Sequence, residues 1–129
     1  MVQLSELRFL VVDDQKTMRD ILRGQLRALG ANFIREARSG REALTVLERQ
    51  PMDVIISDWL MNDIDGLQLL KILRRHPRTR MTPFIMATGV REPEQVKVAL
   101  DTGASGYLVK PFDLLSLRRQ LESVLPLAA

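Results

Sequence analysis

Five short apolar runs alternate with longer amphipathic stretches along the chain, a pattern typical of strands in a parallel sheet joined by helices. The runs span residues 8–12, 33–37, 53–57, 83–87 and 107–110. The first, third and fourth runs are almost continuous in Val, Ile, Leu and Phe, which indicates central strands covered on both faces. The second run alternates more, so we expect it to form an edge strand.

The stretches between the runs predict five helices. In the first, apolar residues recur at helical spacing while charged residues, Arg19 among them, fill the other positions. The apolar positions are Met18, Ile21, Leu22, Leu26 and Leu29. This helix should end at Gly30. The second and third helices should lie at about 40–49 and 67–75, and the fifth should run from Asp113 to 125. The fourth should begin at Pro93, with Val96, Ala99 and Leu100 as its apolar positions. The predicted fold class is α/β, a single domain over residues 1–129 with helices on both faces of the sheet.

Composition narrows the possible chemistry. The 129 residues include no Cys and one His, His76, which excludes thiolate metal sites, cysteine nucleophiles and any site with two imidazoles. The N-terminus has no secretory signal and no apolar run approaches a membrane span, so we expect a cytoplasmic protein without membrane contact. With 19 basic and 16 acidic residues the net charge is only +3, and we expect no binding to nucleic acid.

Polar side chains follow four of the predicted strands where each strand ends. Asp13 and Asp14 follow the first strand, Asp58 the third, Thr88 the fourth and Lys110 the fifth. Because ligands of parallel α/β sheets bind at the carboxyl ends of the strands, these side chains should share one rim. Taken alone, Asp14 or Thr88 is equally compatible with capping a helix. Together, three carboxylates without Cys or His nearby favour a hard cation, and we expect Mg²⁺.

Magnesium bound by carboxylates commonly works beside phosphate, which suggests roles for the other side chains of this rim. The Lys110 ammonium suits a phosphoryl oxygen, and the Thr88 hydroxyl can donate a hydrogen bond to another. A carboxylate can act as the nucleophile and form an aspartyl-phosphate. Asp58 is the natural nucleophile because it stands alone on the central strand, whereas Asp13 and Asp14 form a pair.

The chain resembles the receiver domain of the two-component response-regulator family from Phe9 to about Leu125, and within it the CheY-like single-domain regulators. The resemblance rests on the motifs Val11-Val-Asp-Asp14, Ile56-Ser-Asp-Trp59, Asp65-Gly66, Ala87-Thr-Gly89, Gly103-Ala-Ser-Gly-Tyr107 and Val109-Lys-Pro-Phe112. It implies a flavodoxin-like, CheY-like fold with the strand order 2-1-3-4-5.

The resemblance also implies a role for each residue of the rim. Asp58 would be the phosphoacceptor, and Mg²⁺ would be bound by Asp14, Asp58 and the main-chain carbonyl of Leu60, with Asp13 acting mainly through metal-bound water. Lys110 would pair with a phosphoryl oxygen.

Two further features follow from the same resemblance. Thr88 and Tyr107 match a switch pair in which the hydroxyl moves toward the phosphoryl group and the aromatic ring turns inward. The peptide bond between Lys110 and Pro111 is expected to be cis.

The family resemblance implies a signalling switch in a phosphorelay rather than an enzyme, one that catalyses only its own phosphorylation and dephosphorylation. The expected partners are a histidine kinase, an output protein that binds the face of helix four, strand five and helix five, and a phosphatase, with the chain itself a monomer. The output pathway would be chemotaxis, through the flagellar motor, or the regulation of a kinase. Three alternatives remain: a stand-alone phosphotransfer intermediate, a Mg²⁺-dependent phosphohydrolase that uses an aspartyl-phosphate, and a flavin-binding electron carrier of the same topology.

Two positions depart from the CheY-like pattern near the path of the hydrolytic water. Leu60 stands where that pattern has Asn, and Val90 where it has Glu. Because apolar side chains cannot position water, we expect slow hydrolysis of the phosphoryl group. A basic cluster at Arg74, Arg75, Arg78 and Arg80 favours the end of a helix, and it also suits an acidic partner or a nucleotide.

Overall fold

The five apolar runs form one parallel sheet in the order β2-β1-β3-β4-β5 in the computed structural model, which describes residues 2–127. The strands are β1 (Arg8–Val12), β2 (Phe33–Ala37), β3 (Val54–Ser57), β4 (Phe84–Thr88) and β5 (Gly106–Val109). The predicted fold class and strand order are confirmed. The alternating run forms the edge strand β2, and β5 forms the other edge.

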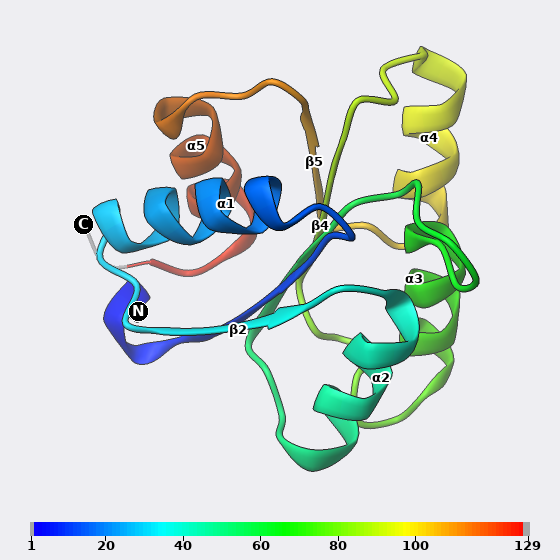
Figure 1. Ribbon diagram of the computed structural model, residues 1–129, viewed down its shortest axis with the longest axis horizontal. Coiled ribbons are helices and arrows are strands. Elements are labelled where there is room, and N and C mark those ends of the chain that lie inside the picture. The colour runs from blue at the N-terminus through cyan, green and yellow to red at the C-terminus, as the bar shows by residue number, and fades with distance from the viewer. Residues whose placement is uncertain (1, 128–129) are drawn as a thin grey trace.

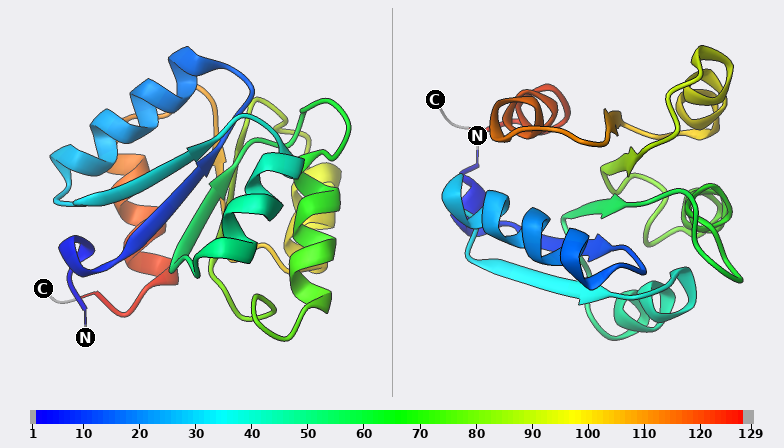
Figure 2. Two further views of the ribbon diagram at one scale, coloured as in Figure 1. Left: turned by 60° about the horizontal axis from the view of Figure 1, so that its bottom comes forward. Right: turned by 45° about the horizontal axis from the view of Figure 1, so that its top comes forward.

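Helices connect the strands and cover both faces of the sheet (Figures 1 and 2). They are α1 (Lys16–Ala28), α2 (Gly40–Arg49), α3 (Gly66–Arg75), α4 (Pro93–Thr102) and α5 (Leu114–Val124), and a short 3-10 helix (Leu4–Glu6) precedes β1. Helices α1 and α5 lie on one face, and α2, α3 and α4 lie on the other. No helix within residues 2–127 combines the length and hydrophobicity needed to cross a membrane.

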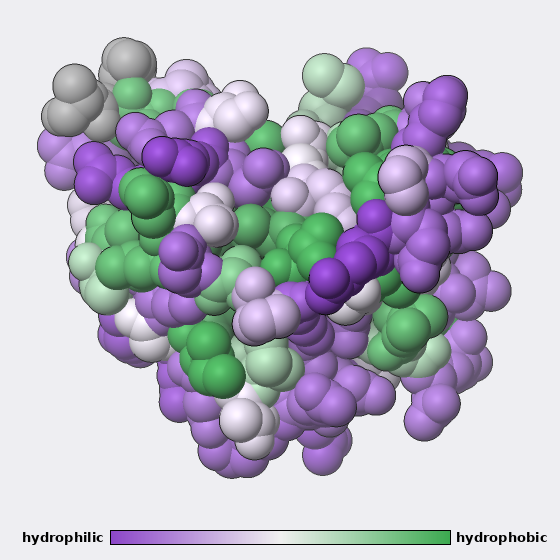
Figure 3. Space-filling view, turned by 90° about the horizontal axis from the view of Figure 1, so that it is seen from above, coloured by the Kyte–Doolittle hydropathy of each residue, from purple (hydrophilic) through white to green (hydrophobic). Residues whose placement is uncertain are grey.

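Side-chain alternation along β1 divides the core into two layers. Leu10 and Val12 pack with residues of α2, α3 and α4, whereas Phe9 and Val11 pack with residues of α1 and α5. All four side chains are fully buried. Outside these layers the surface is largely polar: the face in Figure 3 is hydrophilic around its periphery, with apolar patches toward its middle.

Three apolar positions of the predicted helices do not reach the core, and one of them is Leu114 at the start of α5, which is 40% exposed. Ile21 of α1 and Leu100 of α4 are 43% and 45% exposed. Each lies next in sequence to a buried residue, Leu22 or Ala99, and is therefore turned from it by about 100° around the helix. The apolar stripe of each helix is thus wider than the surface that it buries.

Local side-chain hydrogen bonds fix the starts of α2, α3 and α5. The Ser39 hydroxyl accepts a hydrogen bond from the Glu42 amide, and Asp113 accepts one from the Ser116 amide. Asp65 and Gln68 cap α3 reciprocally, each side chain bonded to the other residue's backbone amide at 2.8 and 2.9 Å.

Gly66, the first residue of α3, packs directly against the backbone that follows β3. Its amide donates a 2.8 Å hydrogen bond to the Trp59 carbonyl. A Cβ atom at this position would overlap the Asp58 carbonyl oxygen and lie 2.8 Å from the Trp59 Cα. The absence of a side chain therefore lets the start of α3 touch the segment that carries Asp58.

We expect the substitution Gly66→Ala to destabilise the fold by roughly 2–3 kcal/mol, because backbone atoms on both sides must shift to admit the methyl group. Urea denaturation monitored by Trp59 fluorescence measures this change. Gly24→Ala is the matched control: nothing lies within 4 Å of that position in α1, so it should stabilise the protein by about 0.5–1 kcal/mol. Equal effects of the two substitutions would contradict the close packing at Gly66.

Candidate functional site

Strand register brings the predicted acidic residues together at the carboxyl end of the sheet. Val12 of β1 pairs with Ser57 of β3, so Asp13 and Asp58 leave adjacent strands side by side. The Asp58 amide donates a 2.9 Å hydrogen bond to the Val12 carbonyl. Asp13, Asp14 and Asp58 each present a carboxylate oxygen within 4.8 Å of the other two.

Lys110 reaches this cluster from the end of β5. Its Nζ atom lies 2.8 Å from Oδ2 of Asp13 and 3.3 Å from Oδ2 of Asp58. The Asp13 side chain is 1% exposed and that of Asp58 is 11% exposed, so the ion pairs are largely shielded from water. The Lys110–Pro111 peptide bond is cis, as the resemblance predicted. One ammonium thus separates two buried carboxylates that would otherwise repel each other.

The Asp58 carboxylate is held in a defined orientation. Its Oδ1 atom accepts a 2.7 Å hydrogen bond from the backbone amide of Trp59. The neighbouring Ser57 hydroxyl donates a 2.8 Å hydrogen bond to the Asp58 carbonyl, which fixes the backbone on the other side. This leaves Oδ2 facing the Lys110 ammonium, where an electrophile between the two groups would meet both.

The oxygen ligands of this cluster fit a hard divalent cation. One ammonium balances only one of the three carboxylates, so the cluster as a whole attracts a cation. The exposed Asp14 carboxylate and the Leu60 main-chain carbonyl make no hydrogen bond within residues 2–127, so both remain available as ligands. Carboxylate and carbonyl oxygens are the ligands that Mg²⁺ prefers in proteins.

A buried arginine, Arg19, supports the turn that carries Asp13 and Asp14. Its guanidinium donates a 2.8 Å hydrogen bond to the Asp13 carbonyl and a 3.1 Å bond to Glu36 on β2. Glu36 also pairs with Arg23, one turn further along α1. The periodicity of α1 placed Arg19 on the solvent side, yet the residue is only 8% exposed. The sequence of β2 could have predicted this contact. Alternate residues of a strand lie on the same face of the sheet, so Glu36 lies on the face of Ile34, which is the face that α1 covers.

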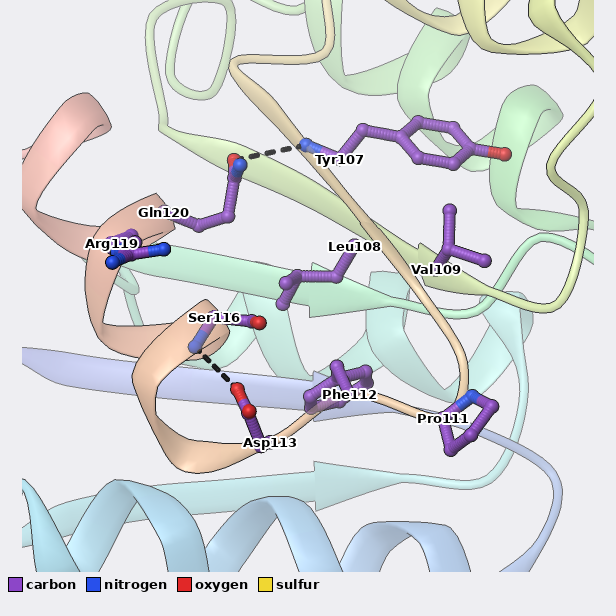
Figure 4. Close-up of a pocket in the computed structure, with 9 residues that line it drawn as sticks. All are labelled: Tyr107, Leu108, Val109, Pro111, Phe112, Asp113, Ser116, Arg119 and Gln120. Atoms are coloured by element: carbon purple, nitrogen blue, oxygen red, sulfur yellow. Dashed lines mark hydrogen bonds between the residues drawn. The ribbon is translucent and has the colours of Figure 1, made fainter.

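Thr88 and Tyr107 both contact the backbone of Val90, in the segment between β4 and α4. The Thr88 hydroxyl, in a side chain that is almost fully buried, accepts a 3.4 Å hydrogen bond from the Val90 amide. The Tyr107 hydroxyl donates a 2.6 Å hydrogen bond to the Val90 carbonyl. The Tyr107 ring extends away from α5, while its backbone amide donates to Gln120 on that helix (Figure 4).

Burial raises the pKa of Tyr107 from its usual value of 10.0 to about 12, and the negative charges of Glu92 and Asp58 add to the effect. The hydroxyl is therefore neutral, and available as a donor to Val90, throughout the physiological pH range.

The two residues that depart from the CheY-like pattern differ in exposure: the Leu60 side chain is 64% exposed, and Val90 is half-buried.

Comparison with known proteins agrees with this geometry. The family model of the response regulator receiver domain matches residues 9–122. The chain is 36% identical over 118 residues to chemotaxis protein CheY-3 of Vibrio cholerae, covering 92% of this chain and 91% of that protein. It is 35% identical to chemotaxis protein CheY of Pseudomonas aeruginosa, covering 92% and 95%.

Solved structures show the same relationship. The chemotaxis response regulator CheY4 of Vibrio cholerae superimposes with a TM-score of 0.85 at 34% identity, covering 92% of this chain and 98% of that one. The receiver domain of Francisella response regulator 1452 gives a TM-score of 0.82 at 32% identity, covering 92% and 96%.

The titration of Tyr107 tests the environment of this segment, and it is unambiguous because the chain has one Tyr. We expect the tyrosinate absorbance of the folded protein to rise with a midpoint near pH 12, against about 10 for the chain unfolded in guanidinium. Since the folded pKa is the higher one, the associated stability is fully present below pH 10 and is lost between pH 10 and 12. A folded midpoint near 10 would contradict the burial of this hydroxyl.

Proposed function

Because the chain belongs to the response regulator receiver domain family, which gives it a role in two-component signalling, we propose that it is a switch operated by phosphorylation of Asp58. The observation that carries this proposal is the position of the Lys110 ammonium, 2.8 Å from Asp13 and 3.3 Å from the Asp58 Oδ2 atom. An ammonium next to the free oxygen of an oriented carboxylate is placed to pair with a phosphoryl group as it arrives.

In the proposed reaction the donor is a phosphohistidine of a histidine kinase or a small acyl phosphate. With phosphohistidine, the phosphorus–nitrogen bond breaks as a phosphorus–oxygen bond to the Asp58 carboxylate forms. The electron pair stays with the leaving imidazole, which takes up a proton. Lys110 pairs with one phosphoryl oxygen, and the Thr88 hydroxyl turns to donate to another.

The residues that would hold Mg²⁺ are Asp14, Asp58 and the Leu60 carbonyl, with Asp13 beside them. When bound, the ion supplies positive charge that offsets the charge of the phosphoryl oxygens. Arg19 contributes indirectly, because its hydrogen bond to the Asp13 carbonyl holds the turn from which two of these carboxylates project.

The backbone of Val90 links the phosphoryl group to the protein surface, so a structural change at the site can reach that surface. A Thr88 hydroxyl that turns toward the phosphoryl group gives up the hydrogen bond from the Val90 amide, and the Val90 carbonyl is the acceptor of the Tyr107 hydroxyl. Tyr107 in turn borders a surface pocket of about 420 Å³ between β5 and α5 (Figure 4). Movement at Thr88 would therefore change this pocket and the face formed by α4, β5 and α5, where we place the output partner.

The proposed output face carries exposed charges of both signs, and its exposed carboxylates are Glu92, Glu94, Asp101, Asp113 and Glu122. Its exposed cations are Arg91, Lys97, Arg118 and Arg119. Lys97 and Arg118 pair with carboxylates of their own helices, whereas Arg91 and Arg119 are in no ion pair within residues 2–127. An acidic segment of the output protein, whether of the flagellar motor or of a kinase, would pair with Arg91 and Arg119.

Phosphorylation by acetyl phosphate tests the assignment of Asp58. With Mg²⁺ present, we expect intact mass spectrometry to show one added phosphoryl group on the wild type and none on Asp58→Asn. Asp63→Asn is the control, since this exposed carboxylate pairs with Arg41 rather than facing Lys110. Lys110→Ala should bind Mg²⁺ yet lose most of the phosphorylation. Full phosphorylation of Asp58→Asn would overturn the proposal.

The apolar Leu60 and Val90 predict a long-lived phosphoryl group. We expect the double substitution Leu60→Asn with Val90→Glu to shorten the half-life of phosphorylated protein about tenfold or more, because polar groups can orient the attacking water. Decay of the intact mass in Mg²⁺ buffer without phosphatase measures both half-lives. Equal decay of the two proteins would contradict this explanation.

A long-lived phosphoryl group also supports a second candidate function, that of a stand-alone phosphotransfer intermediate. This function requires return of the phosphoryl group to a histidine of a second protein faster than its hydrolysis. Loss of the group from Asp58 on adding such a protein, with gain of the same group on its histidine, distinguishes it from an output switch.

A further inference from the structure

An apolar groove lies between α2 and α3 and has no role in the proposed phosphorylation site. Its volume is about 230 Å³. Leu44 and Leu47 of α2 form one wall, and Ile72 and Leu73 of α3 form the other. The Ile72 side chain is 41% exposed, so part of this apolar surface faces water.

Arg78 lines the groove and belongs to a strongly basic segment. Residues 71–81 contain five Lys and Arg residues and no acid. Lys71, Arg75, Arg78 and Arg80 are exposed, and none of them is in an ion pair within residues 2–127. The only carboxylate lining the groove is Glu48 on the α2 side. Together these four unpaired cations form a patch of positive charge.

The segment after α3 that bears Arg78 and Arg80 is held in place by internal hydrogen bonds. The Thr79 hydroxyl donates to the Leu73 carbonyl at 2.8 Å, and the Arg80 amide donates to the His76 carbonyl at 2.9 Å. Arg74 also holds the segment in place, because its guanidinium donates hydrogen bonds to the carbonyls of Thr79 and Gly103. The groove and this basic segment are therefore formed before any ligand arrives, which lowers the entropic cost of binding.

Helix α3 separates the groove from the phosphorylation site. Its first residue, Gly66, touches Asp58, whereas the groove is lined by Ile72 and Leu73 of the helix and by His76 just after it. At a rise of 1.5 Å per residue this places the groove roughly 9–15 Å along the helix from the site. The groove also shares no residue with the pocket between β5 and α5.

We propose that this groove is a docking site for an acidic, amphipathic helix of a partner protein, and that docking does not depend on phosphorylation. Leucine-like side chains at helical spacing enter the groove, and glutamates beside them meet Arg75, Arg78 and Arg80. The volume is below the roughly 300–1,000 Å³ of small-molecule pockets, which favours single anchoring side chains. The aliphatic walls favour peptide over nucleic acid, because no Phe, Tyr or Trp lines the groove and His76 is the only lining side chain with a ring on which a base could stack.

A synthetic peptide of about 14 residues, with Leu along one face of a helix and Glu at the positions that flank this face, is the probe. Amide chemical shifts recorded during a titration locate its site, and the same titration yields the dissociation constant. We expect shifts confined to α2, α3 and residues 76–81, unchanged affinity with beryllofluoride and Mg²⁺, and weaker binding at high salt. A permuted peptide of equal composition, with Leu spread around the helix, should bind at least about tenfold more weakly.

Two matched charge reversals distinguish the groove from the output face. Arg75→Glu with Arg78→Glu removes two positive charges and adds two negative ones, as does Arg91→Glu with Arg119→Glu, so each pair takes the net charge from +3 to −1. We expect the first pair to weaken peptide binding at least about tenfold and the second to change it little. Ile72→Ser tests the apolar wall separately and should also weaken binding, and the dispersion of amide shifts confirms that each variant folds.

Four results would overturn the proposal: no saturable binding of the peptide, equal binding of the permuted peptide, loss of binding only with Arg91→Glu and Arg119→Glu, or tighter binding of a single-stranded oligonucleotide at the same residues. Affinity that changes with beryllofluoride would overturn its independence from phosphorylation. None of these results bears on the phosphorylation of Asp58, which is measured on the protein alone.

Discussion

The Lys110 ammonium lies between the buried carboxylate of Asp13 and that of Asp58, and this contact constrains much of the domain. Two like charges at the end of adjacent strands repel each other, and burial without a counter-ion costs several kcal/mol. Lys110 can offset that cost only if β5 runs parallel to β4 and ends at the same level. The pairing of Thr88 with Val109, followed by the hydrogen bond from the Lys110 amide to the Thr88 carbonyl, provides this level. The geometry of the site therefore depends on the register of the sheet.

Periodicity alone predicted the strands and helices well because both faces of the sheet are covered, which makes β1, β3 and β4 continuous apolar runs. It also predicted one shared rim for Asp13, Asp14, Asp58, Thr88 and Lys110, since each lies at or just after the end of a strand. Strand order is a different case, because periodicity does not state which strands are neighbours. That order came from the resemblance to a family.

Features that depend on contacts across elements could not be predicted. Arg19 looked like a solvent-facing residue because helical periodicity describes one helix and does not include Glu36 on the next strand. Ile21 and Leu100 looked like core residues because the width of the surface that a helix buries depends on its neighbours. The basic cluster after α3 was visible in the sequence, but its position beside an apolar groove depends on how α2 packs against α3.

The length of α3 has a consequence for how two partners could share this protein. A ligand that has equal affinity for two conformations cannot shift the balance between them, so a partner held only at the far end of α3 would leave the switch unbiased. It would instead raise the local concentration of whatever it carries. If that partner also bears a kinase, encounter with Asp58 becomes an intramolecular event at millimolar effective concentration. In that arrangement, the distance along α3 would make the selection of the kinase independent of whether Asp58 is phosphorylated.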